Sequence, residues 1–154
     1  MERHVWSLLC EKTVLEAGTQ SLSILNVYED IQIQGIFDSA IAIPNPPLVP
    51  LALTIVSVWE RSNINGEEDK ESFRVRIIDP NGKELATNEQ VFSLTGPLLR
   101  ARAILRIGGM PISESGRYVF EIQGRRGKKW HVEALLPLVV RILISQQPKL
   151  GKPS

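Results

Sequence analysis

Apolar and polar residues alternate with a period of two along most of this chain, and glycine, proline and asparagine interrupt the alternation at short intervals. Such a period puts successive side chains on opposite faces, as in a β-strand. No stretch of about ten or more residues shows the 3.6-residue period of an amphipathic helix. The pattern therefore predicts an all-β protein and disfavours a parallel α/β fold.

Several segments can be assigned individually. Residues 51–61 are apolar on both faces, which predicts a central, buried strand. Residues 79–83 read Asp-Pro-Asn-Gly-Lys, in which proline presets a turn and Asn-Gly tolerates positive φ, so a hairpin is expected there. Residues 124–129 form a second expected hairpin loop. Residues 35–50 contain four prolines and are expected to be a crossover loop.

The start of the chain combines a strand signal with a segment that fits two kinds of structure. Residues 3–9 alternate so that His4, Trp6 and Leu8 share one face of an expected strand, and residues 11–19 fit either a helical turn or a loop.

About eight strands of this kind predict an antiparallel β-sandwich with an immunoglobulin-like or jelly-roll-like Greek key, two topologies that share these local signals. A chain of 154 residues suits one domain that is large enough to bury a core. We expect residues 1–145 to form this domain. Residues 146–154 hold two prolines and no core residue, which predicts a disordered tail.

The charge balance and the scarcity of metal-binding side chains argue against several classes of function. The net charge is +1, from 18 basic and 17 acidic residues, which is unlike a dedicated nucleic-acid binder. Cys10 is the only cysteine, so neither an intrachain disulfide nor a zinc site built from several thiolates can form. We expect no cofactor and no metal.

Targeting signals are also missing from the sequence. The first residues lack the apolar segment of a secretory signal. Residues 47–58 and 134–144 are the most apolar stretches, and both are too short to cross a bilayer as helices. The protein is therefore expected in the cytoplasm and without a membrane partner.

Residues 113–120 resemble the tyrosine corner of immunoglobulin-like sandwiches, in which a tyrosine hydroxyl ties down the preceding loop. In this chain Phe120 stands where such domains usually carry a cysteine, and Trp59 is placed like their buried core tryptophan. We therefore expect Trp59, Tyr118 and Phe120 to be structural. The resemblance concerns the fold and implies no function.

Five segments spread over most of the chain resemble a family of uncharacterised bacterial proteins of about this length. They are residues 4–10 (His-Val-Trp-Ser-Leu-Leu-Cys), 23–30 (Ser-Ile-Leu-Asn-Val-Tyr-Glu-Asp), 58–61 (Val-Trp-Glu-Arg), 79–82 (Asp-Pro-Asn-Gly) and 116–120 (Gly-Arg-Tyr-Val-Phe). The resemblance implies a domain of unknown function and brings no catalytic residues with it.

Candidate catalytic groups are few and far apart. Cys10 and His4 would lie roughly 20 Å apart along a straight strand, well beyond the hydrogen-bond distance that a nucleophile and its base require. A buried structural role is expected for the cysteine. Glu29, Asp30 and Glu60 contain the carboxylates that acid–base catalysis would need, but no spacing rule brings them together. We expect them at a strand bend and a strand end, and we expect the protein not to be an enzyme.

Residues 63–69 (Asn-Ile-Asn-Gly-Glu-Glu-Asp) are rich in oxygen donors of the kind that bind calcium. They lack the full alternating ligand pattern and the bidentate glutamate of a calcium loop. A solvated acidic turn is the favoured interpretation.

The densest positive charge lies in residues 124–131, where four basic side chains adjoin an aromatic ring: Arg125, Arg126, Lys128, Lys129 and Trp130. This group is a candidate interaction surface, because it could contact phosphate and stack on a base. A basic stripe from Arg100, Arg102 and Arg106 would add to it. The same residues also suit a solvated hairpin tip whose charges discourage aggregation.

Together these features predict a protein of unknown function that serves as a non-enzymatic protein-interaction or structural module of a bacterial cell. Its partner would be another protein, or a second copy of this chain joined through sheet edges or faces. The alternative is a binder of an anionic ligand or nucleic acid through residues 124–131.

Overall fold

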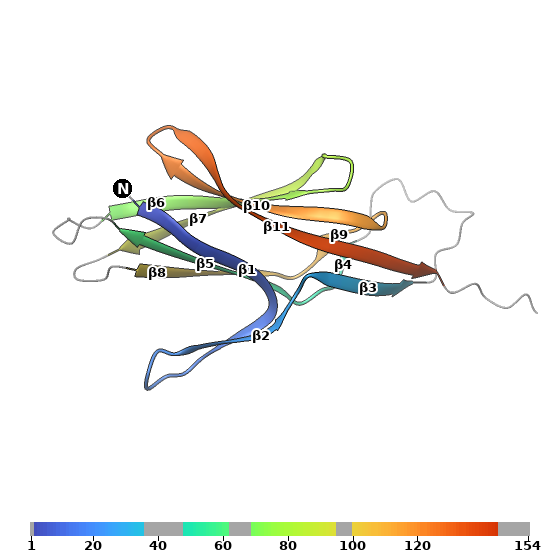
Figure 1. The fold of residues 1–154 in the computed structure, drawn as a ribbon, viewed down its shortest axis with the longest axis horizontal. Helices are drawn as coiled ribbons and strands as arrows, with labels where there is room; N and C mark the ends of the chain where they lie inside the picture. The colour runs from blue at the N-terminus through green and yellow to red at the C-terminus, as the bar shows by residue number, and fades with distance from the viewer. Residues whose placement is uncertain (1, 36–47, 62–68, 95–99, 145–154) are drawn as a thin grey trace, which may run out of the picture.

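The computed structural model describes residues 2–35, 48–61, 69–94 and 100–144, which form eleven strands and no helix (Figure 1). A four-stranded sheet contains, in spatial order, β2 (Leu22–Val27), β1 (Glu2–Leu15), β5 (Leu53–Arg61) and β8 (Arg100–Ile107). A five-stranded sheet contains β3 (Asp30–Gly35), β11 (Lys129–Ile144), β10 (Gly116–Arg126), β6 (Asp69–Ile78) and β7 (Glu84–Leu94). A short ladder joins β4 (Leu48–Val49) to β9 (Met110–Pro111). The all-β prediction is confirmed.

One hydrophobic core lies between the inner faces of the two larger sheets. The four-stranded sheet contributes Leu9, Leu53, Ile55, Trp59 and Leu105. The five-stranded sheet contributes Phe73, Val75, Ile77, Tyr118, Phe120, Ile122, Leu138 and Val140. Strand β5 is buried on both faces, as its sequence predicts. The three residues that were expected to be structural, Trp59, Tyr118 and Phe120, are all in this core.

The strand pairs are antiparallel with one exception, the parallel pair of β3 and β11. The exception arises at the expected bend of residues 29–30. There the chain leaves β2 in the four-stranded sheet and enters β3 in the five-stranded sheet, and the backbone N–H of Val139 donates to the carbonyl of Glu29 at 3.0 Å. The bend therefore moves the chain from one sheet to the other.

The start of the chain differs from the expected alternation. The pairing of β1 with β5 shifts by one residue between His4 and Trp6, so that His4 lies opposite Trp59 while Trp6 lies opposite Val58. Directly opposed residues share a face, and Trp59 belongs to the core. The prediction that His4 and Trp6 share a face is therefore wrong, because an extra residue in one strand reverses the alternation beyond it.

Residues 11–19, which fit either a helical turn or a loop, can now be assigned. Strand β1 continues to Leu15 and β2 returns antiparallel to it, so this segment is mainly a hairpin. At its tip the backbone N–H of Gln20 donates to the carbonyl of Glu16 at 3.0 Å, which closes a single i→i+4 turn. Most of the proline-rich residues 35–50 lie outside the described residues, as does the expected tail. The division into one domain and a tail stays a prediction.

The expected turn at residues 79–83 joins β6 to β7 and is held by Asp79. The carboxylate of Asp79 accepts hydrogen bonds from the backbone N–H groups of Asn81 at 2.9 Å and Lys83 at 2.8 Å. Gly116, at the start of β10, lies close to this turn with a φ of +148°. A Cβ at Gly116 would lie 2.7 Å from Cγ of Pro80, so only glycine fits there.

The Tyr118 hydroxyl donates to the carbonyl of Glu114 at 2.9 Å, which is the tie that a tyrosine corner makes. We expect Tyr118→Phe to lower the free energy of unfolding by about 1–2 kcal/mol, because the variant loses the hydrogen bond that the buried Tyr118 donates to the Glu114 carbonyl. Urea denaturation measures the change. Tyr28→Phe is the matched control, since the Tyr28 hydroxyl makes no hydrogen bond with the described residues. Equal losses of unfolding free energy in the two variants would show that the Tyr118 hydroxyl does not stabilise the protein through its bond to Glu114.

Candidate functional site

Contacts with other side chains of the chain hold part of the basic hairpin between β10 and β11 in place. Arg125 lies opposite Trp130 across the hairpin, and the guanidinium groups of Arg74 and Arg125 lie 4.5 and 5.9 Å from the centre of the Trp130 ring. Such cation–π contacts hold the ring in place. Arg126 pairs with Glu133 at 2.7 Å. Two of the four predicted cations and the predicted aromatic ring thus have partners within the chain, although both arginines are exposed.

The remaining two cations, Lys128 and Lys129, are exposed at the tip of the hairpin. The predicted basic stripe does not join them. Arg100 and Arg102 are in β8 of the other sheet, where Arg100 pairs with Glu60 at 3.2 Å and Arg102 donates to the carbonyl of Gln20 at 2.8 Å. All four cations are exposed on the same hairpin without being extended by the predicted stripe, and their role as an interaction surface stays a prediction.

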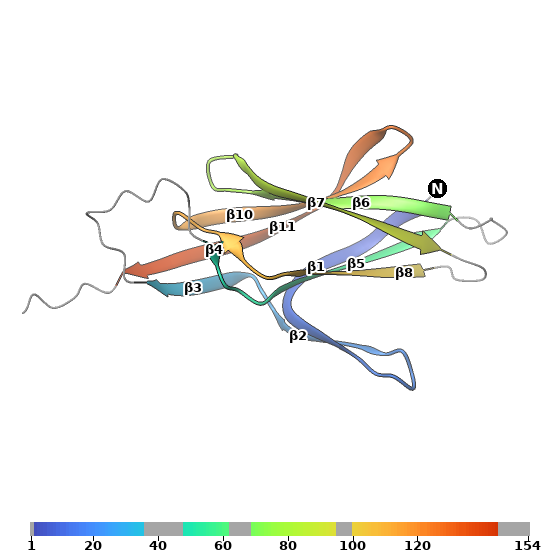
Figure 2. The ribbon, with the colours of Figure 1, turned by 180° about the vertical axis from the view of Figure 1, so that it is seen from behind.

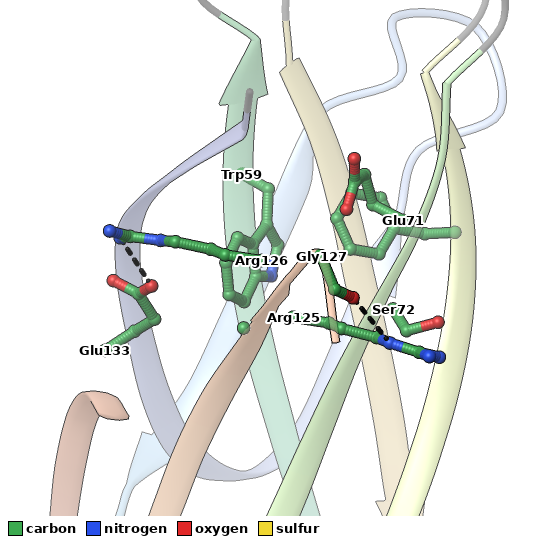
Figure 3. A pocket seen from close by; sticks show the side chains of 9 residues that line it. Trp59, Glu71, Ser72, Arg125, Arg126, Gly127 and Glu133 are labelled. Carbon is green, nitrogen blue, oxygen red and sulfur yellow. Dashed lines mark hydrogen bonds and ion pairs between the residues drawn. The ribbon is translucent and has the colours of Figure 1, made fainter. Parts of the chain in front are cut away.

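Behind this hairpin lies a pocket of about 330 Å³, which we call the Trp59 pocket (Figure 3). Its apolar walls are Trp59 and Phe92, whose ring centres are 5.6 Å apart. Charged side chains complete the lining: Glu71, Arg125, Arg126 and Glu133. Figure 3 shows Trp59 between the Arg126–Glu133 pair on one side and Glu71, Ser72 and Arg125 on the other. The volume falls in the range of small-molecule sites.

A bulge in β11 brings Glu133 into this pocket. The pairing with β10 matches Ile122 to Ala134 but Gln123 to Val132, which leaves Glu133 as an extra residue. A bulge of this kind re-aims the side chain of the extra residue. Sequence reasoning missed Glu133, Glu71 and Phe92 as site residues, since neither the bulge nor the approach of distant strands has a local signal.

Gly124 lets the Trp59 ring lie close against β10. A Cβ at this position would lie 3.0 Å from Cζ3 of Trp59 and 3.2 Å from Oε1 of Glu133. The back of the ring is therefore packed on backbone. His4 contacts the ring from β1 in an edge-to-face arrangement, with 5.1 Å between ring centres and 70° between planes.

The candidate catalytic pair is separated, as its spacing predicts. His4 lies opposite Trp59 and Cys10 lies opposite Thr54 on the same partner strand, which corresponds to about 17 Å along β5. Burial raises the pKa of the Cys10 thiol, so the neutral form is favoured. His4 Nε2 lies 2.8 Å from Ser7 Oγ, which donates to Ser57 Oγ at 2.8 Å.

The candidate carboxylates are also apart. Asp30 begins β3 in one sheet, and Glu60 is in β5 of the other. Hydrogen bonds from Arg3 and Arg100 hold the pKa of Glu60 below its ordinary value, which makes Glu60 a partner of those arginines. Among the described residues no group of three or more His, Cys, Asp or Glu side chains could hold a metal ion. The candidate calcium loop falls outside them except for Asp69.

A second hollow lies on the open side of the sandwich, and we call it the β7–β8 groove. Within the described residues β7 pairs only with β6, and β8 pairs only with β5. Figure 2 shows β7 with its C-terminal end near the start of β8 and its N-terminal part raised away from that sheet. The groove in this wedge has a volume of about 400 Å³. Val75, Ile77 and Leu105 form its buried floor, and Asn88 and Arg106 line its rim.

Comparison with known proteins identifies a family without an assigned function. The model of a family of unknown function, DUF6941, matches residues 6–125. No curated protein matches the chain, and no solved structure matches it. In the part of the chain that the structure describes, no helix is long and apolar enough to cross a membrane. The predicted resemblance to an uncharacterised family is confirmed, and the bacterial source stays a prediction.

We expect Gly124→Ala to destabilise the protein by about 1–3 kcal/mol, since the added methyl group overpacks the contact with Trp59 and Glu133. Urea denaturation followed by tryptophan fluorescence measures the loss. Gly18→Ala is the control, because a Cβ at Gly18 would meet nothing within 4 Å. A tolerated Gly124→Ala would show that the indole ring does not need this close approach.

His4 should make stability depend on pH. Burial holds the pKa of folded His4 below its ordinary value, against the opposing effects of the Glu133 carboxylate and the backbone of Trp6. The unfolded chain therefore takes up the proton more readily, so the stabilisation is present above about pH 6.5 and declines as the pH falls below that value. His4→Gln should flatten this decline, measured by urea denaturation at several pH values.

The exposed His131 provides the control for that experiment, since His131→Gln should keep the pH dependence of the natural protein. Identical pH profiles for all three proteins would show that His4 is not the group responsible.

Proposed function

The chain belongs to the DUF6941 family of unknown function, and we propose that its domain is a non-enzymatic interaction module that binds an extended segment of another protein. The observation that carries the proposal is the β7–β8 groove. Two edge strands frame it, and each carries a row of backbone groups without a strand partner among the described residues. An extended peptide can add to such an edge through main-chain hydrogen bonds.

The lining of the groove supports a particular kind of segment. The side chains of Val75, Ile77 and Leu105 form an apolar floor, which favours a peptide with apolar residues at alternate positions. Asn88, on the rim, has its side-chain N–H donors for peptide backbone, while its Oδ1 accepts from Gln90 at 2.6 Å. Arg106 is exposed on the rim without an ion pair among the described residues. Its charge favours an acidic residue in the partner.

Several further expectations belong to the same proposal. We propose an immunoglobulin-like or jelly-roll-like Greek key, supported by the Tyr118 tie and the core position of Trp59. We also propose a cytoplasmic role in a bacterial cell. The non-enzymatic role is supported by the separation of Cys10 from His4. The alternative is an anionic ligand or nucleic acid bound by the hairpin, where Arg125 and Arg126 stay exposed although Arg126 pairs with Glu133.

The test uses a displayed library of random peptides as the probe, selected on the full chain. We expect the selected peptides to alternate apolar residues and to carry an acidic residue. They should shift the backbone amide resonances of residues 85–88 and 105–109. Arg106→Glu should weaken their binding about tenfold, a free-energy change of about 1.4 kcal/mol.

Arg117→Glu is the matched control, since Arg117 is exposed on β10, away from the groove, and its reversal changes the net charge equally. Peptides whose binding is insensitive to Arg106→Glu, or that shift other resonances, would overturn the proposal. Sedimentation at rising concentration adds a second readout. A dimer that Arg106→Glu dissociates would identify a second copy of this chain as the occupant instead.

A further inference from the structure

The Trp59 pocket contains a buried donor for which the described residues provide no acceptor. The Trp59 side chain is 3% exposed, and its indole nitrogen has no hydrogen-bond partner in the part of the chain that the structure describes. An indole nitrogen can only donate, and buried donors in folded proteins are almost always paired. Figure 3 shows this nitrogen on the side of the ring that faces Gly127. An acceptor atom of a bound molecule would satisfy this donor.

The charges around the pocket define that molecule further. Arg125 uses its Nε to donate to the carbonyl of Gly127 at 3.1 Å, and Arg126 uses one terminal nitrogen to pair with Glu133. A guanidinium has five N–H donors, so both arginines keep donors for a ligand. A carboxylate would satisfy them together with the indole N–H.

The acidic side chains limit how much negative charge the ligand can carry. Glu71 and Glu133 line the same pocket as the two arginines, so the four charged side chains sum to zero. Like charges nearby disfavour a doubly charged group. A singly charged carboxylate is repelled less by Glu71 and Glu133 than a phosphate dianion, and a pocket of about 330 Å³ is too small for a polyanion.

The apolar walls indicate the rest of the ligand. Trp59 and Phe92 present aromatic rings to the pocket, and Phe92 is only partly buried. Aromatic rings pair favourably in offset or edge-to-face geometries. We propose that the Trp59 pocket binds a small monocarboxylate that carries an aromatic ring. This site is separate from the β7–β8 groove, so it goes beyond the proposed interaction function.

The experiment is an NMR titration of the isotopically labelled full chain, in which the three tryptophan indole N–H resonances are assigned individually. The probes are benzoate, the uncharged benzamide and inorganic phosphate. We expect benzoate to move the Trp59 indole resonance downfield in a saturable way. Benzamide and phosphate should bind at least about tenfold more weakly, since each lacks one of the two features. The resonance of Trp6, which does not line the pocket, should stay in place.

Two variants locate the binding. Arg125→Gln removes one cation and should weaken benzoate binding about tenfold. Lys129→Gln is the matched control, because Lys129 is exposed on the same hairpin and does not line the pocket. Phe92→Leu keeps an apolar wall without an aromatic ring, and it should weaken benzoate more than it weakens acetate. Amide spectra confirm that each variant is folded.

Three outcomes would overturn the proposal. The first is a Trp59 resonance that does not move at about 10 mM benzoate, well above the dissociation constants usual for fragments of this size. The second is equal movement with all three probes. The third is equal affinity of the Arg125→Gln and Lys129→Gln variants for benzoate. A Trp59 indole N–H that exchanges its proton with water but does not respond to benzoate counts as the first outcome.

Discussion

The burial of β5 on both of its faces is the constraint on which the rest of the structure depends. One face supplies Leu53, Ile55 and Trp59 to the core between the sheets. The other face is also closed to solvent, and the β1–β2 hairpin lies beneath it in both views (Figures 1 and 2). The hydrogen bond from Arg102 to Gln20 holds the tip of that hairpin to β8. A strand enclosed in this way cannot slip, because a one-residue shift would exchange its two faces.

Two bulges bring polar side chains to the end of the sandwich at which Trp59 lies. The shift in β1 turns His4 inward onto Trp59, and the bulge in β11 turns Glu133 toward the same ring. Gly124 completes the arrangement by leaving room for the indole. Of the residues that line the Trp59 pocket, Glu133 is therefore positioned by a bulge, a device that often re-aims functional side chains in β-proteins.

The two hollows share β7 but use opposite ends of it. Phe92, near the end of the strand, lines the Trp59 pocket, whereas Asn88 and the residues before it line the β7–β8 groove. The sheets are close at the first end because aromatic rings of β5, β6 and β7 pack together there. They separate at the other end. A ligand in the pocket and a peptide in the groove would therefore occupy different parts of one molecule.

The sequence by itself determined the all-β character, the hairpins at residues 79–83 and 124–129, and the core positions of Trp59, Tyr118 and Phe120. Alternation and turn residues are local signals, and they act over a few neighbouring positions. Only the tertiary structure decided which charged residues meet. Arg126 was grouped with Lys128 and Lys129, yet it pairs with Glu133 through a bulge that alternation does not reveal. The pocket itself draws on five strands from both sheets, and such contacts depend on how the strands pair and pack.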